Sequence, residues 1–304
     1  MLSVNNLSKS FGEIRAVAGV SFEIGPGESF GLLGPNGAGK TTTISMIVGT
    51  VQPDSGQVTL NGVPMGGDRS AAKAKIGFVP QELALYDELS ATANLRFFGA
   101  LYGLFGQAAD EAAARVLCTV GLQDRSKEPV RNFSGGMKRR LNIAVGLLHE
   151  PDLLILDEPT VGVDPQSRNA IFETLMDLRL RGTAMLYTTH YMEEVERLCR
   201  RVAIMDKGVI IAQGELSNLV SRDNGPQWLT LQLDRALSPT SIPGTLSCQS
   251  RDEELTVQVE NLDYDLTKVL EWVQAQGASV RTIRSRHTSL EEVFLELTGR
   301  SLRD

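Results

Sequence analysis

The stretch that decides the fold is Gly34-Pro35-Asn36-Gly37-Ala38-Gly39-Lys40-Thr41, with Thr42 directly after it. It matches the phosphate-loop pattern G-x-x-x-x-G-K-[ST] at every required position. An apolar run, Ser29 to Leu33, precedes it, and a helical stretch from Thr41 to about Val48 follows it. Glycines let backbone N–H groups turn toward phosphate oxygens without Cβ clashes, and the helix adds the positive end of its dipole. The stretch therefore predicts a triphosphate site where a strand meets a helix, with residues 34–42 as its binding loop.

Lys40 and Thr41, the last two residues of the pattern, carry its specific chemistry. Lys40 is expected to bridge the β- and γ-phosphates, and the hydroxyl of Thr41 to hold Mg²⁺. The alternative is a chance glycine turn, but flexible glycines would weaken an element with a purely structural role. The loop therefore favours a nucleoside triphosphate with Mg²⁺ as its ligands.

A second motif is an apolar run that ends in two carboxylates, Leu153-Leu154-Ile155-Leu156-Asp157-Glu158. Asp157, at the carboxyl end of a buried strand, is placed to hold Mg²⁺ directly or through one of its ligands. Glu158 points elsewhere in the pleat and can polarise a water for in-line attack on the γ-phosphorus. The alternative is a strand followed by a solvated acidic turn. Beside a phosphate loop, the pair favours metal binding and catalysis.

The composition fits a folded chain of two domains. The chain has 304 residues, and at about 150 residues per domain this length predicts two domains. Acidic residues outnumber basic ones 37 to 30, and the net charge of −7 argues against nucleic acid as a partner. Cys118, Cys199 and Cys248 show no metal-ligand spacing, which favours a reducing cytoplasm. Since no stretch resembles a signal peptide or a membrane span, any membrane role is expected to go through a partner.

The order of apolar segments predicts an α/β fold. Residues 1–25 alternate apolar and polar positions between glycines, which predicts a lobe of short antiparallel strands. Farther along, predicted strands alternate with helices, which indicates crossover units and a parallel, buried sheet. These strands are expected at 76–79, 153–156, 184–188 and 202–205, with helices at about 165–180 and 192–200.

The same pattern divides the chain into parts. Residues 1–220 are predicted to form the nucleotide-binding unit, with an inserted helical subdomain at about 82–150. The character changes around Arg222 to Pro226, and residues 221–304 carry strands and helices of their own, which predicts a small C-terminal α/β domain. This second domain shows no residue cluster of catalytic spacing. Regulation, dimerisation, contact with a partner and simple stabilisation all remain open for it.

A third motif, Phe133-Ser134-Gly135-Gly136-Met137, is a second glycine turn that opens a helix. Ser134 is a good N-cap, and Gly135 and Gly136 expose backbone donors, so the turn predicts a second anion site. With the phosphate loop, the carboxylate strand and the later His190, the chain resembles the ATP-binding cassette (ABC) family, the ATPase subunits of ABC transporters, over about residues 1–214. The resemblance implies a P-loop ATPase core with an antiparallel β lobe and an inserted helical subdomain. It also implies two such units paired head to tail, with ATP between one unit's phosphate loop and the other's Ser134-Gly135-Gly136.

The resemblance assigns further residues by their place in the family's motifs. Gln81 is similar to the glutamine that senses Mg²⁺ and the attacking water, although a plain loop amide is the alternative. Asp164 is similar to the aspartate that crosses the dimer interface, and His190 to the switch histidine at the γ-phosphate. Phe11 sits where the family usually has a tyrosine that stacks on adenine, although a core ring is the alternative. The resemblance also implies the metal role of Asp157 and the catalytic base role of Glu158.

Two positions depart from the family's pattern. The usual motif begins with Leu and ends with Gln, whereas Phe133 and Met137 stand there in this chain. Ser134, Gly135 and Gly136, the expected phosphate contacts, are intact. The departure puts in doubt only a polar contact from position 137 to the opposite nucleotide.

The segment after Gln81 and the ending Ser289 to Gly299 resemble the ATPases of ABC-2 type exporters, which pump drugs, ions, polysaccharides or lipids outward. In that family the region after Gln81 forms a groove for a helix of the membrane subunit. Aromatic anchors would suit such a groove, although a core role is the alternative for most of them; the residues are Leu85, Tyr86, Phe97, Phe98 and Tyr102. The resemblance thus implies a cytoplasmic ATPase held at the inner face of the membrane by a separate permease.

Two other classes of function compete with an exporter ATPase. A soluble ABC ATPase acting on ribosomes or DNA would usually carry two cassettes or a long coiled coil, and this chain shows neither. A phosphate-loop kinase outside the family would leave Ser134 to Gly136 and His190 unexplained. Co-purification with a membrane protein, and release of phosphate instead of its transfer, distinguish the three classes.

Overall fold

The structure is a computed structural model that describes residues 1–65, 70–220, 227–237, 239, 241–260, 262–286 and 290–298. The chain divides into two units, Met1–Gly214 and Glu215–Leu302. The division falls after Gly214 and not after residue 220 as predicted, because helix α8 (Leu216–Val220) packs against helix α10 (Leu290–Thr298) of the second unit. The predicted linker at Arg222 to Pro226, and the terminal residues Ser289 and Gly299, lie outside the described residues.

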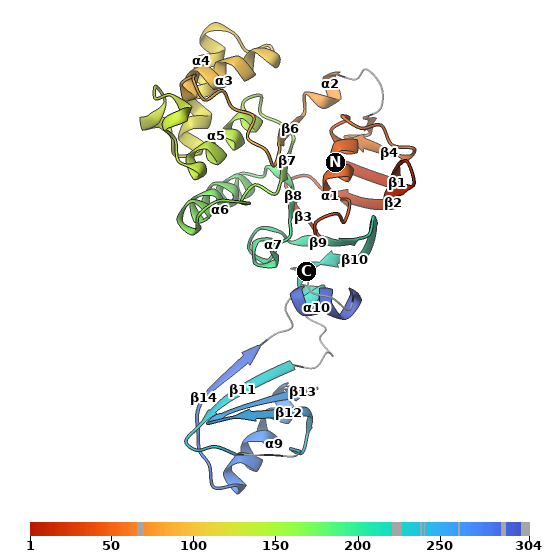
Figure 1. Cartoon of the computed structure of the whole chain (residues 1–304), viewed down its shortest axis with the longest axis vertical. Helices are drawn as coiled ribbons and strands as arrows, with labels where there is room; N and C mark the ends of the chain where they lie inside the picture. The colour runs from red at the N-terminus through yellow and green to blue at the C-terminus, as the bar shows by residue number, and fades with distance from the viewer. Residues whose placement is uncertain are drawn as a thin grey trace. The chain divides into compact units, whose positions relative to one another are not determined.

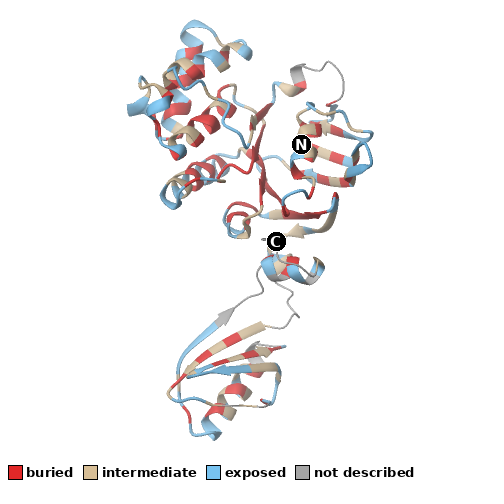
Figure 2. Ribbon diagram, viewed as in Figure 1, coloured by how far each residue is buried: buried red, intermediate tan, exposed pale blue. Residues whose placement is uncertain are grey.

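The first unit is built on a six-stranded sheet in the order β10-β9-β3-β8-β7-β6. The central strands pair in parallel, β3 with β8 and β9, and β7 with β8 and β6. Strands β3, β7 and β8 are buried along their whole length, as Figure 2 shows, because helices or the β lobe cover both faces. The strands are β3 (Ser29–Leu33), β6 (Ile76–Val79), β7 (Leu153–Asp157), β8 (Ala184–Thr189), β9 (Arg201–Asp206) and β10 (Val209–Glu215).

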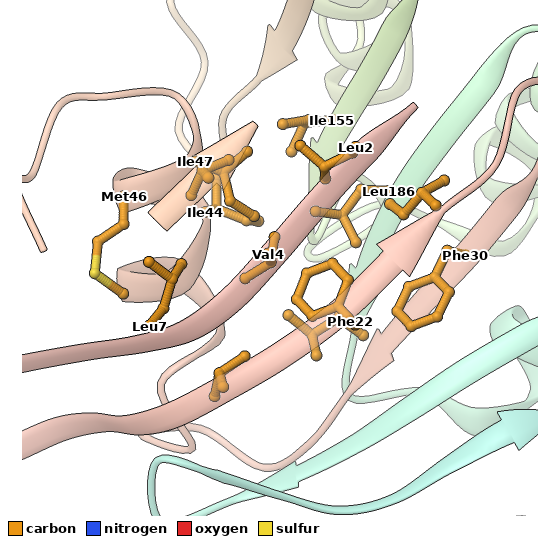
Figure 3. Close-up of a cluster of buried hydrophobic side chains, with 14 of the residues drawn as sticks. Leu2, Val4, Leu7, Phe22, Phe30, Ile44, Met46, Ile47, Ile155 and Leu186 are labelled. Carbon is orange, nitrogen blue, oxygen red and sulfur yellow. The ribbon is translucent and has the colours of Figure 1, made fainter. Parts of the chain in front are cut away.

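An antiparallel sheet in the order β2-β1-β4-β5 forms the β lobe beside it (Figure 1). The lobe, helix α1 and the parallel sheet share one hydrophobic core, in which the rings of Phe22 and Phe30 stack with centroids 5.1 Å apart. Figure 3 shows Ile44 and Ile47 of α1 packed between the two sheets. The elements are β1 (Leu2–Phe11), β2 (Ile14–Ile24), α1 (Lys40–Ile47), β4 (Ser55–Leu60) and β5 (Val63–Pro64). This shared core fixes the position of α1, and with it the phosphate loop.

A group of helices stands apart from the β lobe within the same unit (Figure 1). It contains α3 (Ala91–Leu101), α4 (Gly106–Thr119), the 3₁₀ turns η1 (Gln123–Arg125) and η2 (Val130–Asn132), and α5 (Gly135–Leu147). The helical pattern was expected from residue 82, but the first helix begins only at Ala91. Ser90 caps it, since its hydroxyl accepts a hydrogen bond from the N–H of Ala93 at 3.1 Å. The buried side chain of Asn94 then holds the preceding turn through both backbone groups of Tyr86.

The described residues of the first unit also form helices α2 (Ser70–Lys73), α6 (Pro165–Leu180) and α7 (Met192–Leu198). Helix α6 has the predicted bounds, because Asp164 caps it and Pro165 occupies its first position, where a missing N–H costs nothing. Helix α7 packs on β3 and β8 and also contacts α6. In the described part of the chain, no helix combines the length and hydrophobicity needed to cross a bilayer.

The second unit has a four-stranded sheet in the order β12-β13-β11-β14, with its paired strands antiparallel. Its core joins alternate residues of β11 and β13 to helix α9 through Leu229, Leu231, Val257, Val269 and Val273. Strand β12 was not predicted, because its polar residues lie at the sheet edge. The elements are β11 (Gln227–Leu233), β12 (Thr245–Arg251), β13 (Glu254–Val259), α9 (Leu262–Ala275) and β14 (Val280–Arg286). The predicted α/β class is confirmed, since the first unit joins a largely parallel sheet to an antiparallel β lobe and helices, and the second unit packs a helix on a small antiparallel sheet.

Candidate active site

The phosphate loop connects the buried strand β3 to helix α1. A cavity of about 720 Å³ opens at this loop and is lined by residues 36–42, by Gln81 and Glu158, and by the nearby residues Ile14, Arg15, Ala16, Lys207 and Gly208. Two positions of the loop need glycine because a side chain there would clash with neighbouring backbone atoms. This requirement is separate from the need to leave room for phosphates. A Cβ atom at Gly34 would lie 2.3 Å from the carbonyl oxygen of Met205. At Gly39, where φ is 104°, a Cβ atom would lie 2.5 Å from the carbonyl oxygen of Ala16. The loop is therefore locked against the strands on either side of it.

Lys40 projects into the site from the first residue of α1 and is almost completely buried. Its Nζ donates hydrogen bonds to the carbonyl oxygens of Gly34 at 2.7 Å and Pro35 at 3.1 Å. The same Nζ lies 3.1 Å from Oε1 of Glu158. The loop carbonyls and this carboxylate thus orient the ammonium group of Lys40 in the lining of the cavity, where phosphate oxygens would compete for it.

Asp157 ends strand β7, and its carboxylate accepts a hydrogen bond from the Thr188 hydroxyl at 2.6 Å. Burial raises the pKa of this carboxyl, while hydrogen bonds from Thr188 and Thr41 lower it. A buried carboxylate joined to the hydroxyl of Thr41 offers the hard oxygen ligands that Mg²⁺ prefers. No group of three or more acidic, His or Cys ligands occurs among the described residues. One carboxylate with a hydroxyl fits Mg²⁺ nevertheless, because this ion is usually held by one or two carboxylates together with phosphates.

Glu158 follows directly and adopts a left-handed backbone conformation with φ of 46°. Its N–H donates to both the carbonyl oxygen and the hydroxyl of Thr188, at 3.2 and 3.1 Å. The strand has ended by this point, so the left-handed turn, and not alternation in the pleat as predicted, separates Glu158 from Asp157. A non-glycine residue in this conformation costs about 1–3 kcal/mol and is typical of functional sites.

His190 completes the group from the end of β8. Its Nδ1 lies 3.2 Å from Oε2 of Glu158. The two carboxylate oxygens of Glu158 therefore contact different partners, Lys40 on one side and His190 on the other. Three residues that are far apart in the sequence thus form one connected group, and two of them, Lys40 and Glu158, line the cavity.

Gln81 lies at the edge of this site, whereas Phe11 is not among the residues that line the cavity. Gln81 is separated from the end of β6 by Pro80, is exposed and lines the cavity. Phe11 ends β1 with its ring 51% exposed, so it is not the core residue that the alternative interpretation required. The cavity wall nearest to it is formed by Ile14, Arg15 and Ala16 at the start of β2.

The second glycine turn and Asp164 do not line this cavity but lie close to each other. Ser134 caps α5 by accepting a hydrogen bond from the N–H of Met137 at 3.2 Å. A Cβ at Gly136 would lie 2.1 Å from Oγ of Ser167, in the first turn of α6. Asp164 caps α6 by accepting from the N–H of Ser167 at 2.9 Å, and these bonds lower the pKa of its carboxyl. Gly136 thus allows the two helix starts to approach each other.

The structure also reveals polar residues that the motifs did not single out. Arg139 and Asn142 of α5 are buried and donate to the carbonyl oxygen of Pro80, at 3.1 and 3.4 Å. They therefore hold the backbone just before Gln81. Glu194 of α7 is also buried and accepts hydrogen bonds from three hydroxyls. In the sequence, these charged and polar residues look like exposed positions of a helix. Only the contacts made in the folded chain show that they are buried.

Comparisons with known proteins agree with this geometry. The family model described as ABC transporter matches residues 17–161. The chain is 45% identical to the linearmycin resistance ATP-binding protein LnrL of Bacillus subtilis, with all of both chains covered. It is 38% identical to the Nod factor export ATP-binding protein I of Ralstonia nicotianae, covering all of this chain and 95% of that one.

Solved structures share the fold of the first unit. A structure of the ATP-binding subunit of an ABC transporter is 31% identical and matches with a TM-score of 0.65, covering 72% of this chain and 91% of that chain. An ATP-binding cassette solved as a dimer in a post-hydrolysis state, with ADP and Pi, is 25% identical and matches with a TM-score of 0.64, covering 71% and 99%. The fold and site define an ATP-binding cassette, and its activity is that of an ATPase. The chain belongs to the family of ABC transporter ATP-binding proteins.

Proposed function

We propose that the chain is the ATP-hydrolysing subunit of a membrane exporter and drives a separate permease. The observation that carries this proposal is that Glu158, which lines the cavity beside Lys40, contacts both Lys40 and His190. The relatives named for linearmycin resistance and Nod factor export support an exporter. Drugs, ions, polysaccharides and lipids are the substrate classes expected for it.

Within this site each residue has a proposed role. Lys40 and the backbone N–H groups of residues 34–42 bind the triphosphate, while Phe11 stacks on the adenine. Thr41, Gln81 and Asp157 hold Mg²⁺, which would neutralise charge on the β- and γ-phosphates when bound. Glu158 takes a proton from the attacking water, and His190 holds the carboxylate and contacts the γ-phosphate. Catalysis then comes from positioning and electrostatic stabilisation.

A second ATP-binding subunit, most simply a second copy of this chain, is the proposed partner in hydrolysis. Ser134, Gly135 and the N-terminus of α5 are exposed and contact nothing at the cavity of their own chain. A helix N-terminus with free N–H groups suits the phosphates of a nucleotide bound by the partner. Asp164, exposed beside them, would lie at the same interface.

The permease is proposed to dock beside Gln81. The rings of Tyr86, Phe97 and Phe98, from the segment that follows Gln81 in the chain, form one cluster, with Tyr86 and Phe97 4.8 Å apart and both about half exposed. Tyr102, expected in the same group, stacks instead on His149 at 3.7 Å. Exposed aromatic rings are typical anchors for a partner helix. Docking of this kind would hold the chain on the cytoplasmic face of the membrane.

The test is the variant Glu158→Gln, with Glu193→Gln as a matched control on the exposed surface. The amide keeps the size of the side chain but cannot accept the proton, and loss of such a group costs on the order of 10²–10³ in rate. Glu158→Gln should therefore bind ATP with wild-type affinity and hydrolyse it at least about 100-fold more slowly. Near-normal turnover in this variant would remove Glu158 from the proposed role, and transfer of phosphate to an acceptor would indicate a kinase.

A further inference from the structure

Glu194 of α7 is a buried carboxylate that the roles above do not use. It is 2% exposed and accepts three hydrogen bonds from hydroxyl groups. Thr160 donates to Oε1 at 2.6 Å, while Thr189 and Tyr187 donate to Oε2 at 2.7 and 2.9 Å. The nearest basic group is Nε of Arg168, 4.0 Å from Oε1. Both oxygens are thus fully engaged, with one cation close by.

Two of these partners enclose the segment that presents Asp164. Thr160 lies two residues after Glu158, and the chain then turns through Gly162 to the N-cap of α6. Arg168 lies in the first turns of that helix, and its N–H bonds the carbonyl oxygen of Asp164 at 2.9 Å. Glu194 therefore contacts the chain on both sides of Asp164.

The third partner leads to His190. Thr189 is the last residue of β8 and directly precedes the histidine. Its hydroxyl donates to Glu194 and accepts from the N–H of Tyr191 at 2.9 Å. The backbone is thus fixed on both sides of His190. A single carboxylate joins this turn to the segment that carries Asp164.

We propose that Glu194 is a positioning residue for hydrolysis, which holds the Thr160–Arg168 segment and the His190 turn in one fixed relation. Its carboxylate contacts neither the phosphate loop nor the cavity, so it acts through His190 and Asp164 and not on ATP directly. The inference rests on the proposed roles of those two residues. A movement of the segment with Asp164, at the proposed interface, would move His190 with it.

The decisive comparison sets Glu194→Ala against Glu194→Gln, with Glu193→Ala as the exposed neighbour. Alanine leaves three buried hydroxyls without their acceptor. Glutamine keeps one acceptor oxygen, and its NH₂ group can donate a hydrogen bond to the Thr160 hydroxyl. We expect kcat of Glu194→Ala to fall on the order of 10²-fold, as for an active-site displacement of about 1 Å. Its KM for ATP should stay within about twofold, because Lys40 and the loop are untouched. Glu194→Gln should recover most of kcat.

A milder pair of variants covers the case in which Glu194→Ala does not fold. Thr160→Val and Tyr187→Phe each remove one hydroxyl from the same carboxylate. Tyr187 lies within β8, and its hydroxyl also contacts Thr160. Tyr187→Phe keeps the bonds of Thr160 and Thr189 to Glu194, so it should lower the melting temperature but change kcat little. Thr160→Val should lower kcat at least about 10-fold for a similar loss of stability.

Either of two results would overturn the inference. The first is an equal effect of Thr160→Val and Tyr187→Phe on kcat. The second is a loss of kcat in Glu194→Ala that only parallels its loss of melting temperature and that Glu194→Gln does not recover. His190→Ala, measured beside them, separates the two levels of the account. Normal turnover in Glu194→Ala with impaired His190→Ala refutes only the role of Glu194. Normal turnover in both His190→Ala and Glu158→Gln refutes the proposed function.

Discussion

Gly136, in the second glycine turn, has a steric role that can be tested separately from phosphate binding. A methyl group there would lie 2.1 Å from Oγ and 2.2 Å from Cβ of Ser167. Ser167 in turn holds Asp164 through its N–H, at 2.9 Å. The change Gly136→Ala therefore acts on the start of α6, although it leaves every backbone N–H of the turn in place.

The size of the effect follows from the contact distances. Carbon atoms in contact lie at about 3.5 Å or more, so a Cβ pair at 2.2 Å must separate by about 1.3 Å. Overpacking of this kind costs about 1–3 kcal/mol. For a unit of this size that corresponds to a fall of about 2–12 °C in melting temperature. A displacement of about 1 Å near the reacting groups lowers turnover on the order of 100-fold.

The assay compares the single variant with two double variants by thermal unfolding and ATP hydrolysis. Gly136→Ala/Ser167→Gly removes both clashing atoms and leaves only Cα of residue 167, at 3.4 Å, so it should recover most stability and turnover. Gly136→Ala/Ser167→Ala keeps the Cβ contact at 2.2 Å and should recover little. Equal recovery in both double variants, or in neither, would refute the steric argument.

Three further predictions concern the cavity and its supports. Lys40→Ala should lose ATP binding in a calorimetric titration, since its Nζ is the ammonium group that the loop and Glu158 hold in the lining of the cavity; unchanged affinity would contradict the phosphate-loop assignment. Asp157→Asn should raise the stability of the nucleotide-free protein by about 1 kcal/mol while it reduces hydrolysis. Burial raises the pKa of Asp157 above its ordinary value of 3.8, so the ionised carboxylate destabilises the fold. This destabilisation is complete above the raised pKa and disappears as the pH falls toward the ordinary value, so the gain in melting temperature should shrink over that range. Arg139→Met should lower kcat with little change in stability, since the buried guanidinium holds the Pro80 carbonyl beside Gln81; a wild-type kcat would show that this contact is dispensable.

Much of the first unit could be predicted because its elements carry complete local signals. Ser29–Leu33 and Ile76–Val79 are short apolar runs next to glycine or proline, and both form strands with the predicted bounds. Asp164 followed by Pro165 marks the start of α6 in the same way. For the same reason the phosphate-loop motif located the cavity. The individual roles of its residues stay predictions, which the variants above test.

The remainder depends on contacts that no local pattern contains. The left-handed turn at Glu158 is held by Thr188, from a strand formed thirty residues later. The close approach at Gly136 depends on the start of α6, and Glu194 looks in sequence like any other acidic residue of an amphipathic helix. Strand β12 lacks apolar alternation because it lies at an edge of its sheet.

The central claim is that each bound ATP is shared between two chains, and one measurement of molecular mass tests it. With MgATP, light scattering of Glu158→Gln should give twice the 33.0 kDa of one chain. Adding Ser134→Asp keeps the helix cap but places a carboxylate against the partner's γ-phosphate, so this double variant should bind ATP equally well and stay a single chain. Two results would contradict this claim. One is a double variant that pairs as readily as Glu158→Gln. The other is a Glu158→Gln protein that remains a single chain with ATP bound.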